Sequence, residues 1–337
     1  MVIKISLQDQ IMNFLQSIKT IKGVEHCVLT QRDGNPIQSV GIWLSKNEVF
    51  NVSASTSAIY NCGLQIHQNN LKYILIEGNR SKILISPLKN TDNPTLERVI
   101  EAQGLQNQEN EFFIALSTHP QVNLGGVMVK TKQSLLEIKK ALILSGESFK
   151  PPLRHYDQSE LEKIYQLFNA KDDLSKIDNL DLTSFNISDE INNNLQSTIL
   201  DYGRQILDLQ ETYVAIDGGF VTAHIASNSE MNNNVDSRAS MTYSIFSTSD
   251  KCAWFLKKMH IDSILLECQN DYQFINRAGN GILSTTVQKG RQKLGLLRLI
   301  IPRYAQKIGK IIEEGQKKQQ FSDNVVNFKA LFSELTL

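Results

Sequence analysis

Two stretches of the sequence align without a gap, and they decide how the chain is organised. They are NCGLQIHQNNLKYILIE at residues 61–77 and KCAWFLKKMHIDSILLE at residues 251–267, with an offset of 190 positions throughout. Each begins in a helical pattern and ends in an apolar run, Tyr73–Glu77 or Ser263–Glu267, that is typical of a strand. The repeat predicts that one structural unit occurs twice in the chain.

The features that flank these stretches repeat in the same order. Asp33-Gly34 and Asp217-Gly218 each lie between two strand-like runs, a pattern that favours a hairpin turn. Leu124-Gly125 and Leu294-Gly295 each open an apolar helical stretch. Each copy therefore predicts the order helix, two strands, helix, three strands, helix.

The periodicity also gives approximate bounds for these elements. In the first copy we expect a helix on Leu7–Ile21 with a capping-box-like Ser6 and Asp9, a second helix ending near His67, strands at Leu71–Glu77, Lys82–Pro87 and Glu111–Ser117, and a helix at Leu124–Leu144. In the second copy we expect helices at Glu190–Leu209, Val235–Met259 and Leu294–Ile312, and strands at Ile261–Glu267, Tyr272–Ile275 and Gly281–Val287.

Three further segments complete the division of the chain. A polar insertion at 89–110 interrupts the first copy, with a short helix expected at Thr95–Ala102. We expect domains at 1–145 and 189–314. A linker at 146–188 joins them and carries a short helix after the capping pair Ser159 and Glu162. The tail at 315–337 resumes after a polar stretch as a separate small apolar helix or strand that must dock on something.

Composition narrows the class of protein. The length of 337 residues favours two globular domains. The 35 basic and 35 acidic side chains give no net charge, which argues against nucleic acid as a partner. No apolar run approaches the length of a membrane span, so we expect a soluble protein without direct membrane insertion. The four cysteines are widely spaced within apolar stretches, which indicates free thiols and a cytoplasmic location.

The sequence lacks the motifs of a catalytic or cofactor site. No phosphate-binding loop follows a strand, the six histidines show no zinc-ligand spacing, and the acidic stretch Asp172–Asp181 lacks the order of a calcium loop. Glu77 and Glu267 end equivalent strands and could form a catalytic pair, but a solvent-facing or lysine-paired role is the favoured interpretation. We therefore predict no enzyme activity of its own, no metal and no cofactor.

The second helix of each copy is rich in small side chains. The stretches Val52–Ala58 and Ser237–Ser244 allow another helix to approach closely, which favours an interaction face over ordinary packing on the helix's own sheet. Taken together, the Asp-Gly hairpin, the Tyr-Ile-Leu-Ile or Ser-Ile-Leu-Leu strand and the Leu-Gly helix start resemble the roadblock family, over roughly 260 residues in two copies.

This resemblance implies a fold of the mixed α/β class, an α+β sandwich. In each domain a five-stranded antiparallel sheet has one helix on one face and two on the other. Family members usually pair through the second helix and the following edge strand, which here would join Leu71–Glu77 to Ile261–Glu267 in a continuous ten-stranded sheet. Both strands are apolar on both faces, so pairing would cover two aggregation-prone edges.

The resemblance further implies a regulatory or scaffolding module that binds small Ras-like GTPases. The alternatives are a structural subunit that pairs with other roadblock chains, and a small-ligand sensor, for which no convergent polar pocket residues are evident. Arg80 and Arg277 follow strands and could act as arginine fingers, although ordinary turn arginines are favoured. The candidate interaction residues are Ser57, Tyr60, Ile74, Leu75, Ser244, Ile264 and Leu265.

Overall fold

The computed structural model describes residues 6–41, 45–68, 70–88, 112–144, 188–228, 234–256 and 260–334. The expected insertion at 89–110 and the expected linker helix lie outside these residues, as do four short gaps within the copies. Side chains are described up to residue 142 in the first copy and up to residue 316 in the second.

The predicted order of elements is present in both copies. The first contains α1 (Leu7–Lys19), β1 (Val24–Gln31), β2 (Pro36–Gly41), α2 (Lys46–Ile66), β3 (Leu71–Gly78), β4 (Lys82–Pro87), β5 (Phe112–Thr118) and α4 (Leu124–Leu144). The second contains α6 (Asp189–Gly203), β6 (Leu209–Ile216), the 3-10 turn η3 (Asp217–Gly219), β7 (Phe220–Ala226), α7 (Val235–Phe255), β8 (Ile261–Cys268), β9 (Asp271–Ala278), β10 (Gly281–Gln288) and α8 (Leu294–Glu334).

Local chemistry explains where the helices begin and the hairpins turn. The Ser6 side chain accepts a hydrogen bond from the Asp9 N–H, and Ser45 forms a reciprocal capping box with Glu48 at the start of α2. Gly34 and Gly218 have φ angles of 95° and 75°, the left-handed region that a tight hairpin needs and that glycine adopts without strain. The two Asp-Gly hairpins are therefore confirmed.

Three helix ends differ from the prediction. Helix α7 ends at Phe255 rather than near Met259. Helix α6 ends at Gly203 rather than near Leu209, because the chain turns through Asp208, at φ 58°, directly into β6. Helix α8 continues for 41 residues instead of ending near Ile312, so the tail is not a separate element. Its polar stretch, Gln316–Gln320, is made of lysines and glutamines, which are good helix formers and give the helix no reason to stop.

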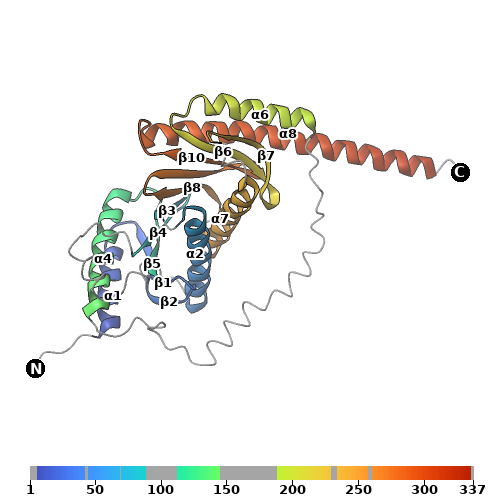
Figure 1. The fold of residues 1–337 in the computed structure, drawn as a ribbon. Coiled ribbons are helices and arrows are strands. Elements are labelled where there is room, and N and C mark those ends of the chain that lie inside the picture. The colour runs from blue at the N-terminus through green and yellow to red at the C-terminus, as the bar shows by residue number, and fades with distance from the viewer. Residues whose placement is uncertain are drawn as a thin grey trace, which may run out of the picture.

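All ten strands form one antiparallel sheet, in the order β2-β1-β5-β4-β3-β8-β9-β10-β6-β7. Helices α1, α4, α6 and α8 cover one face, and α2 and α7 lie against each other on the opposite face (Figure 1). The expected continuous sheet is confirmed, as is the expected contact between the second helices.

The seam between the copies is the antiparallel ladder of β3 and β8. Ile74 pairs with Leu266 on the face covered by α2 and α7, whereas Leu75 pairs with Leu265 on the opposite face. Every one of these side chains is buried, so the seam is apolar on both sides of the sheet. Full burial of each such side chain contributes about 1.5–3 kcal/mol, which makes the seam a major part of the core.

We predict that Leu265→Asp prevents stable folding, because an unpaired buried carboxylate costs several kcal/mol and a domain's whole stability is only about 5–15 kcal/mol. Thermal unfolding followed by circular dichroism measures the loss. The control is Asn193→Asp on the exposed side of α6, which should unfold like the parent protein. A Leu265→Asp variant with the parent's transition would contradict the buried seam.

Candidate functional site

The structure places six of the seven predicted interaction residues inside the molecule. Ser57, Tyr60, Ile74, Leu75, Ile264 and Leu265 are buried, and only Ser244 is exposed. Ser57 therefore does not belong to an exposed interaction face of α2. Its hydroxyl donates a hydrogen bond to the Arg32 carbonyl, because the β1–β2 hairpin packs onto α2 at this point. A Cβ at Gly34 would lie 3.3 Å from the Ala54 Cα, so the small side chains of α2 accommodate the hairpin.

Ser244 lies on an exposed surface formed by α7 and the turn before β7. On this surface the Tyr243 hydroxyl donates to Asp217 Oδ1 at 3.1 Å and fixes the turn against the helix. Burial and the neighbouring Asp217 charge raise the pKa of Tyr243 to about 12, so the phenol keeps its proton. Phe220 follows the turn and is 73% exposed. The surface therefore combines small polar and aromatic side chains.

Glu77 and Glu267 do not form a catalytic pair. Glu77 forms ion pairs with Lys82 at 3.2 Å and with Arg298 of α8 at 3.3 Å. Glu267 forms an ion pair with Lys289 at 2.8 Å. The interpretation of paired strand-end glutamates is confirmed. Since Arg298 belongs to the second copy and Glu77 to the first, one of these pairs also ties the two copies together.

The two candidate arginines occupy different environments. Arg80 lies in the turn between β3 and β4, as expected. Arg277 lies within β9 rather than in a turn, which corrects the prediction. Its guanidinium contacts Asp250 at 2.9 Å and the Ile261 carbonyl at 3.0 Å, and it stacks over the Phe246 ring at 4.9 Å. These contacts give Arg277 a structural role between α7 and the sheet.

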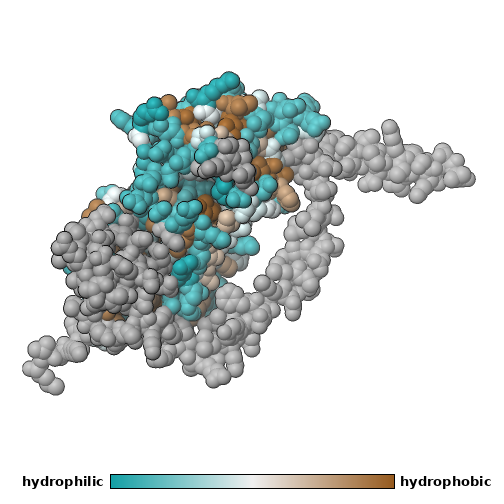
Figure 2. All heavy atoms as spheres, in the orientation of Figure 1, coloured by the Kyte–Doolittle hydropathy of each residue, from teal (hydrophilic) through white to brown (hydrophobic). Residues whose placement is uncertain are grey.

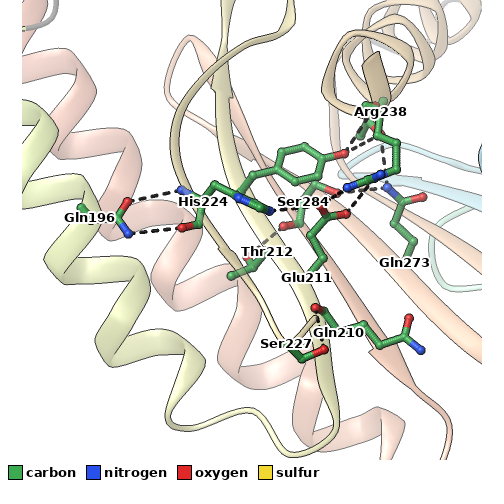
Figure 3. Close-up of polar contacts among 11 residues, drawn as sticks. Gln196, Gln210, Glu211, Thr212, His224, Ser227, Arg238, Gln273 and Ser284 are labelled. Carbon is green, nitrogen blue, oxygen red and sulfur yellow. Dashed lines mark hydrogen bonds and ion pairs between the residues drawn. The ribbon is translucent and has the colours of Figure 1, made fainter. Parts of the chain in front are cut away.

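A polar cluster lies beneath α7 in the second copy (Figure 3). Arg238 forms two hydrogen bonds to the Glu211 carboxylate, at 3.1 and 2.5 Å, and His224 Nε2 contacts the same carboxylate at 3.1 Å. Gln196 reaches from α6 to both main-chain groups of His224, at 3.3 and 3.2 Å. The cluster thus combines residues of four elements, α6, β6, β7 and α7.

The same cluster continues across the seam to the first copy. Tyr213 donates to Thr242 at 2.8 Å, and the Gln273 amide nitrogen donates to Thr242 and Ser284 at 3.2 and 3.1 Å. Gln273 Oε1 lies 2.8 Å from Nε2 of His67, the residue that ends α2. The hydrogen bonds therefore join α7, β9, β10 and the end of α2.

Protonation states follow from this arrangement. Burial opposes ionisation of Glu211, but the hydrogen bonds and charges of His224 and Arg238 outweigh it and hold the pKa of Glu211 below its usual value. Burial lowers the pKa of His67, with Gln273 and the Asp271 charge acting in the opposite direction. Glu211 is therefore ionised and His67 neutral at neutral pH.

A cleft of about 370 Å³ opens beside this cluster, between the two copies. Its walls are the end of α2, the β8–β9 turn and the neighbouring parts of β6, α7 and β10. They include His67, Glu211, Arg238, Asp271 and Gln273. The expectation that no convergent polar pocket exists is therefore wrong. The wall residues come from elements that lie far apart in the sequence, so no local motif predicts the cleft.

Other kinds of site find no support in the part of the chain that the structure describes. No group of three His, Cys, Asp or Glu side chains within it is placed to hold a metal ion. None of its helices combines the length and the apolar character that a membrane span requires. All four cysteines are free thiols, as predicted, and burial raises the pKa of Cys252 to about 12.

Several solved structures are similar to parts of this chain. One of them is a Roadblock/LC7 domain, the family that the sequence resembles. An MglB in a tetrameric arrangement is 17% identical, with 37% of this chain and 92% of the other covered and a TM-score of 0.34. A Roadblock/LC7 domain from Streptomyces avermitilis is 11% identical over 41% and 99% of the two chains, with a TM-score of 0.30. MglC from Myxococcus xanthus is 12% identical over 39% and 98%, with a TM-score of 0.27. No family model and no curated protein matches the chain.

We predict that Arg238→Ala destabilises the protein by about 2–4 kcal/mol, because it leaves the Glu211 charge buried with His224 as its remaining neighbour. Urea unfolding measures this loss. Arg204→Ala is the matched control, since Arg204 is 79% exposed and, among the residues that the structure describes, forms an ion pair with Asp201 alone. Its effect should stay within about 0.5 kcal/mol. Equal effects of the two variants would contradict the importance of the buried cluster.

Proposed function

We propose that the chain is a non-enzymatic regulatory or scaffolding module that binds a small Ras-like GTPase through its joined pair of roadblock-like domains, 1–145 and 189–314. The observation that supports this most directly is the single ten-stranded sheet, in which the edge strands β3 and β8 pair with each other and neither edge remains open. The pair behaves as one unit with helices on both faces, which is the arrangement that the sequence's resemblance to the roadblock family implies.

The outer surface offers places for a protein partner. In the view of Figure 2 the described surface is mostly hydrophilic, with hydrophobic residues gathered over the α6 and α8 region at the top. The exposed apolar side chains of α6 and α8 include Leu200, Leu296 and Leu299, which are 44%, 48% and 61% exposed. On the opposite side of the sheet, α7 presents Ser244. Exposed apolar side chains rimmed by polar ones are typical of protein-binding surfaces.

Any effect on nucleotide hydrolysis would come from the partner's active site. The two glycine-containing stretches that could suggest phosphate binding have structural roles instead. Gly125 and Gly126 open α4, and Gly279 forms the β9–β10 turn with a φ of 60°. A Cβ at Gly279 would approach the Gly309 carbonyl to 3.0 Å, so close packing on α8 explains this glycine.

A structural subunit that pairs with other roadblock chains is the second candidate. The observation that favours it is that β2 and β7 form the two outer edges of the sheet, where a further strand could add. Such a chain would assemble with its partners without any dependence on a bound nucleotide. That difference separates the two functions experimentally.

We predict that the purified chain binds a small Ras-like GTPase at micromolar concentration and that Ser244→Asp weakens binding about tenfold, because a carboxylate enters the contact surface. Bead-based binding to a panel of GTPases loaded with GDP or a GTP analogue measures this. Gln133→Asp, at an exposed glutamine of α4, is the control and should bind like the parent protein. If no GTPase binds in either state, the structural-subunit function replaces this one.

We also predict that Arg80→Ala leaves GTPase binding and the partner's hydrolysis rate largely unchanged. Arg80 lies in a turn, and the roadblock resemblance requires no arginine finger. Single-turnover hydrolysis by the bound GTPase tests this. A finger contributes about 10³–10⁵ in rate, so a loss of that size on substitution would show that Arg80 acts in the partner's active site.

A further inference from the structure

Three polar residues of the network beside the cleft, Gln273, Ser284 and Tyr213, have apolar counterparts in the first copy. The strand ladders give the equivalent positions, since Leu266 pairs with Gln273 as Ile76 pairs with Ile83. By the same registers Ser284 corresponds to Ala115, and Tyr213 corresponds to Val28. At these three positions the first copy therefore holds apolar side chains, whereas its counterparts of Glu211 and Thr286 are the polar residues His26 and Ser117.

This difference is costly for stability. Gln273 and Tyr213 are 2% and 1% exposed, and burying such polar groups costs free energy that their hydrogen bonds only partly return. Replacing a buried ion pair with packed apolar side chains is often neutral or stabilising. Since the first copy shows that the fold accepts apolar side chains at the positions of Gln273, Ser284 and Tyr213, the polar side chains there are best explained by a use for the surface of the cleft.

The volume of the cleft suits a small molecule. Its volume of about 370 Å³ lies in the range of small-molecule sites, about 300–1,000 Å³. His67, Gln68 and Asn70 form the wall from the first copy, and Gln210, Asp271 and Asn270 form the wall from the second. The His67–Gln273 hydrogen bond at 2.8 Å holds the two walls in place. The cleft is therefore formed before any ligand arrives.

The charges around the cleft favour a cation. Two carboxylates, Glu211 and Asp271, line it together with one guanidinium, Arg238. Arg238 already faces Glu211 through two hydrogen bonds, which makes it a poor receptor for an anionic ligand. The end of α2 adds the negative pole of a helix, and the neutral His67 adds no opposing charge.

Asp271 is the group best placed to receive the cation. Its Oδ1 accepts a hydrogen bond from Gln210 at 2.8 Å, which orients the carboxylate, and among the described residues no hydrogen bond engages Oδ2. Asp271 is half-buried, so its charge is only partly screened by water. The surrounding amide side chains supply further hydrogen-bond acceptors.

We propose that the cleft between the copies binds a small polar organic cation with a primary ammonium group, for which Asp271 is the counter-ion. The ammonium donates to Asp271 and to neighbouring amide oxygens, and the rest of the molecule lies along the wall formed by the end of α2. Because residues of both copies form the site, the ligand binds only the joined pair. This binding requires no GTPase and is independent of the function proposed above.

Isothermal titration of the full-length protein with putrescine tests the proposal. Putrescine is compared with 1,4-butanediol and succinate, which have the same chain length but carry neutral or negative end groups. We expect saturable binding of putrescine only. Equal binding of butanediol, preferential binding of succinate, or no binding of putrescine would each overturn the proposal.

Two variants locate the site. Asp271→Asn keeps an acceptor for Gln210 but removes the charge, so putrescine affinity should fall about tenfold or more, as expected for a hydrogen bond to a charged group. Asp262→Asn removes an equally negative but exposed side chain of β8 outside the cleft and should leave affinity unchanged. Both variants should unfold at the parent temperature. Equal losses in the two variants would show nonspecific charge attraction and overturn the site.

Discussion

The pairing of β3 with β8 is the interaction on which the rest of the structure depends. Each strand is apolar on both faces, so an unpaired copy would expose both an open row of backbone hydrogen-bonding groups and a hydrophobic edge. The ladder covers both edges at once. Because the two copies belong to one chain, each meets the other at a high effective concentration, and the pairing does not require a second molecule.

The seam also determines what lies on either side of it. Once β3 and β8 are in register, α2 must lie against α7, and the end of α2 must lie beside β9. The contact between His67 and Gln273 follows from that register, as does the ion pair of Glu77 with Arg298. The cleft is thus a product of the pairing, because neither copy alone supplies both of its walls.

The parts of the fold that the sequence predicts are those with local causes. Asp-Gly hairpins, capped helices and apolar strands leave patterns within a few residues, and the seam follows from two strands that are too apolar to remain edges. The cleft leaves no such pattern because Glu211, Arg238 and Gln273 come from separate elements. Ser57 shows a related limit, since a small polar side chain suits both an exposed helix face and a close contact with a hairpin.

The two copies share an architecture but differ in the side chains that fill the layer between the sheet and the α2–α7 helices. The first packs its side of the α2–α7 layer with Val52, Ile83 and Ala115, which contribute burial without unmet polar groups. The second places Thr242, Gln273 and Ser284 at the corresponding positions and depends on a complete hydrogen-bond network there. Such a network is tolerable only where the surrounding structure is rigid and well packed. The apolar seam meets that requirement, so the stability of the joint allows one copy to carry polar side chains at positions where the other copy is apolar.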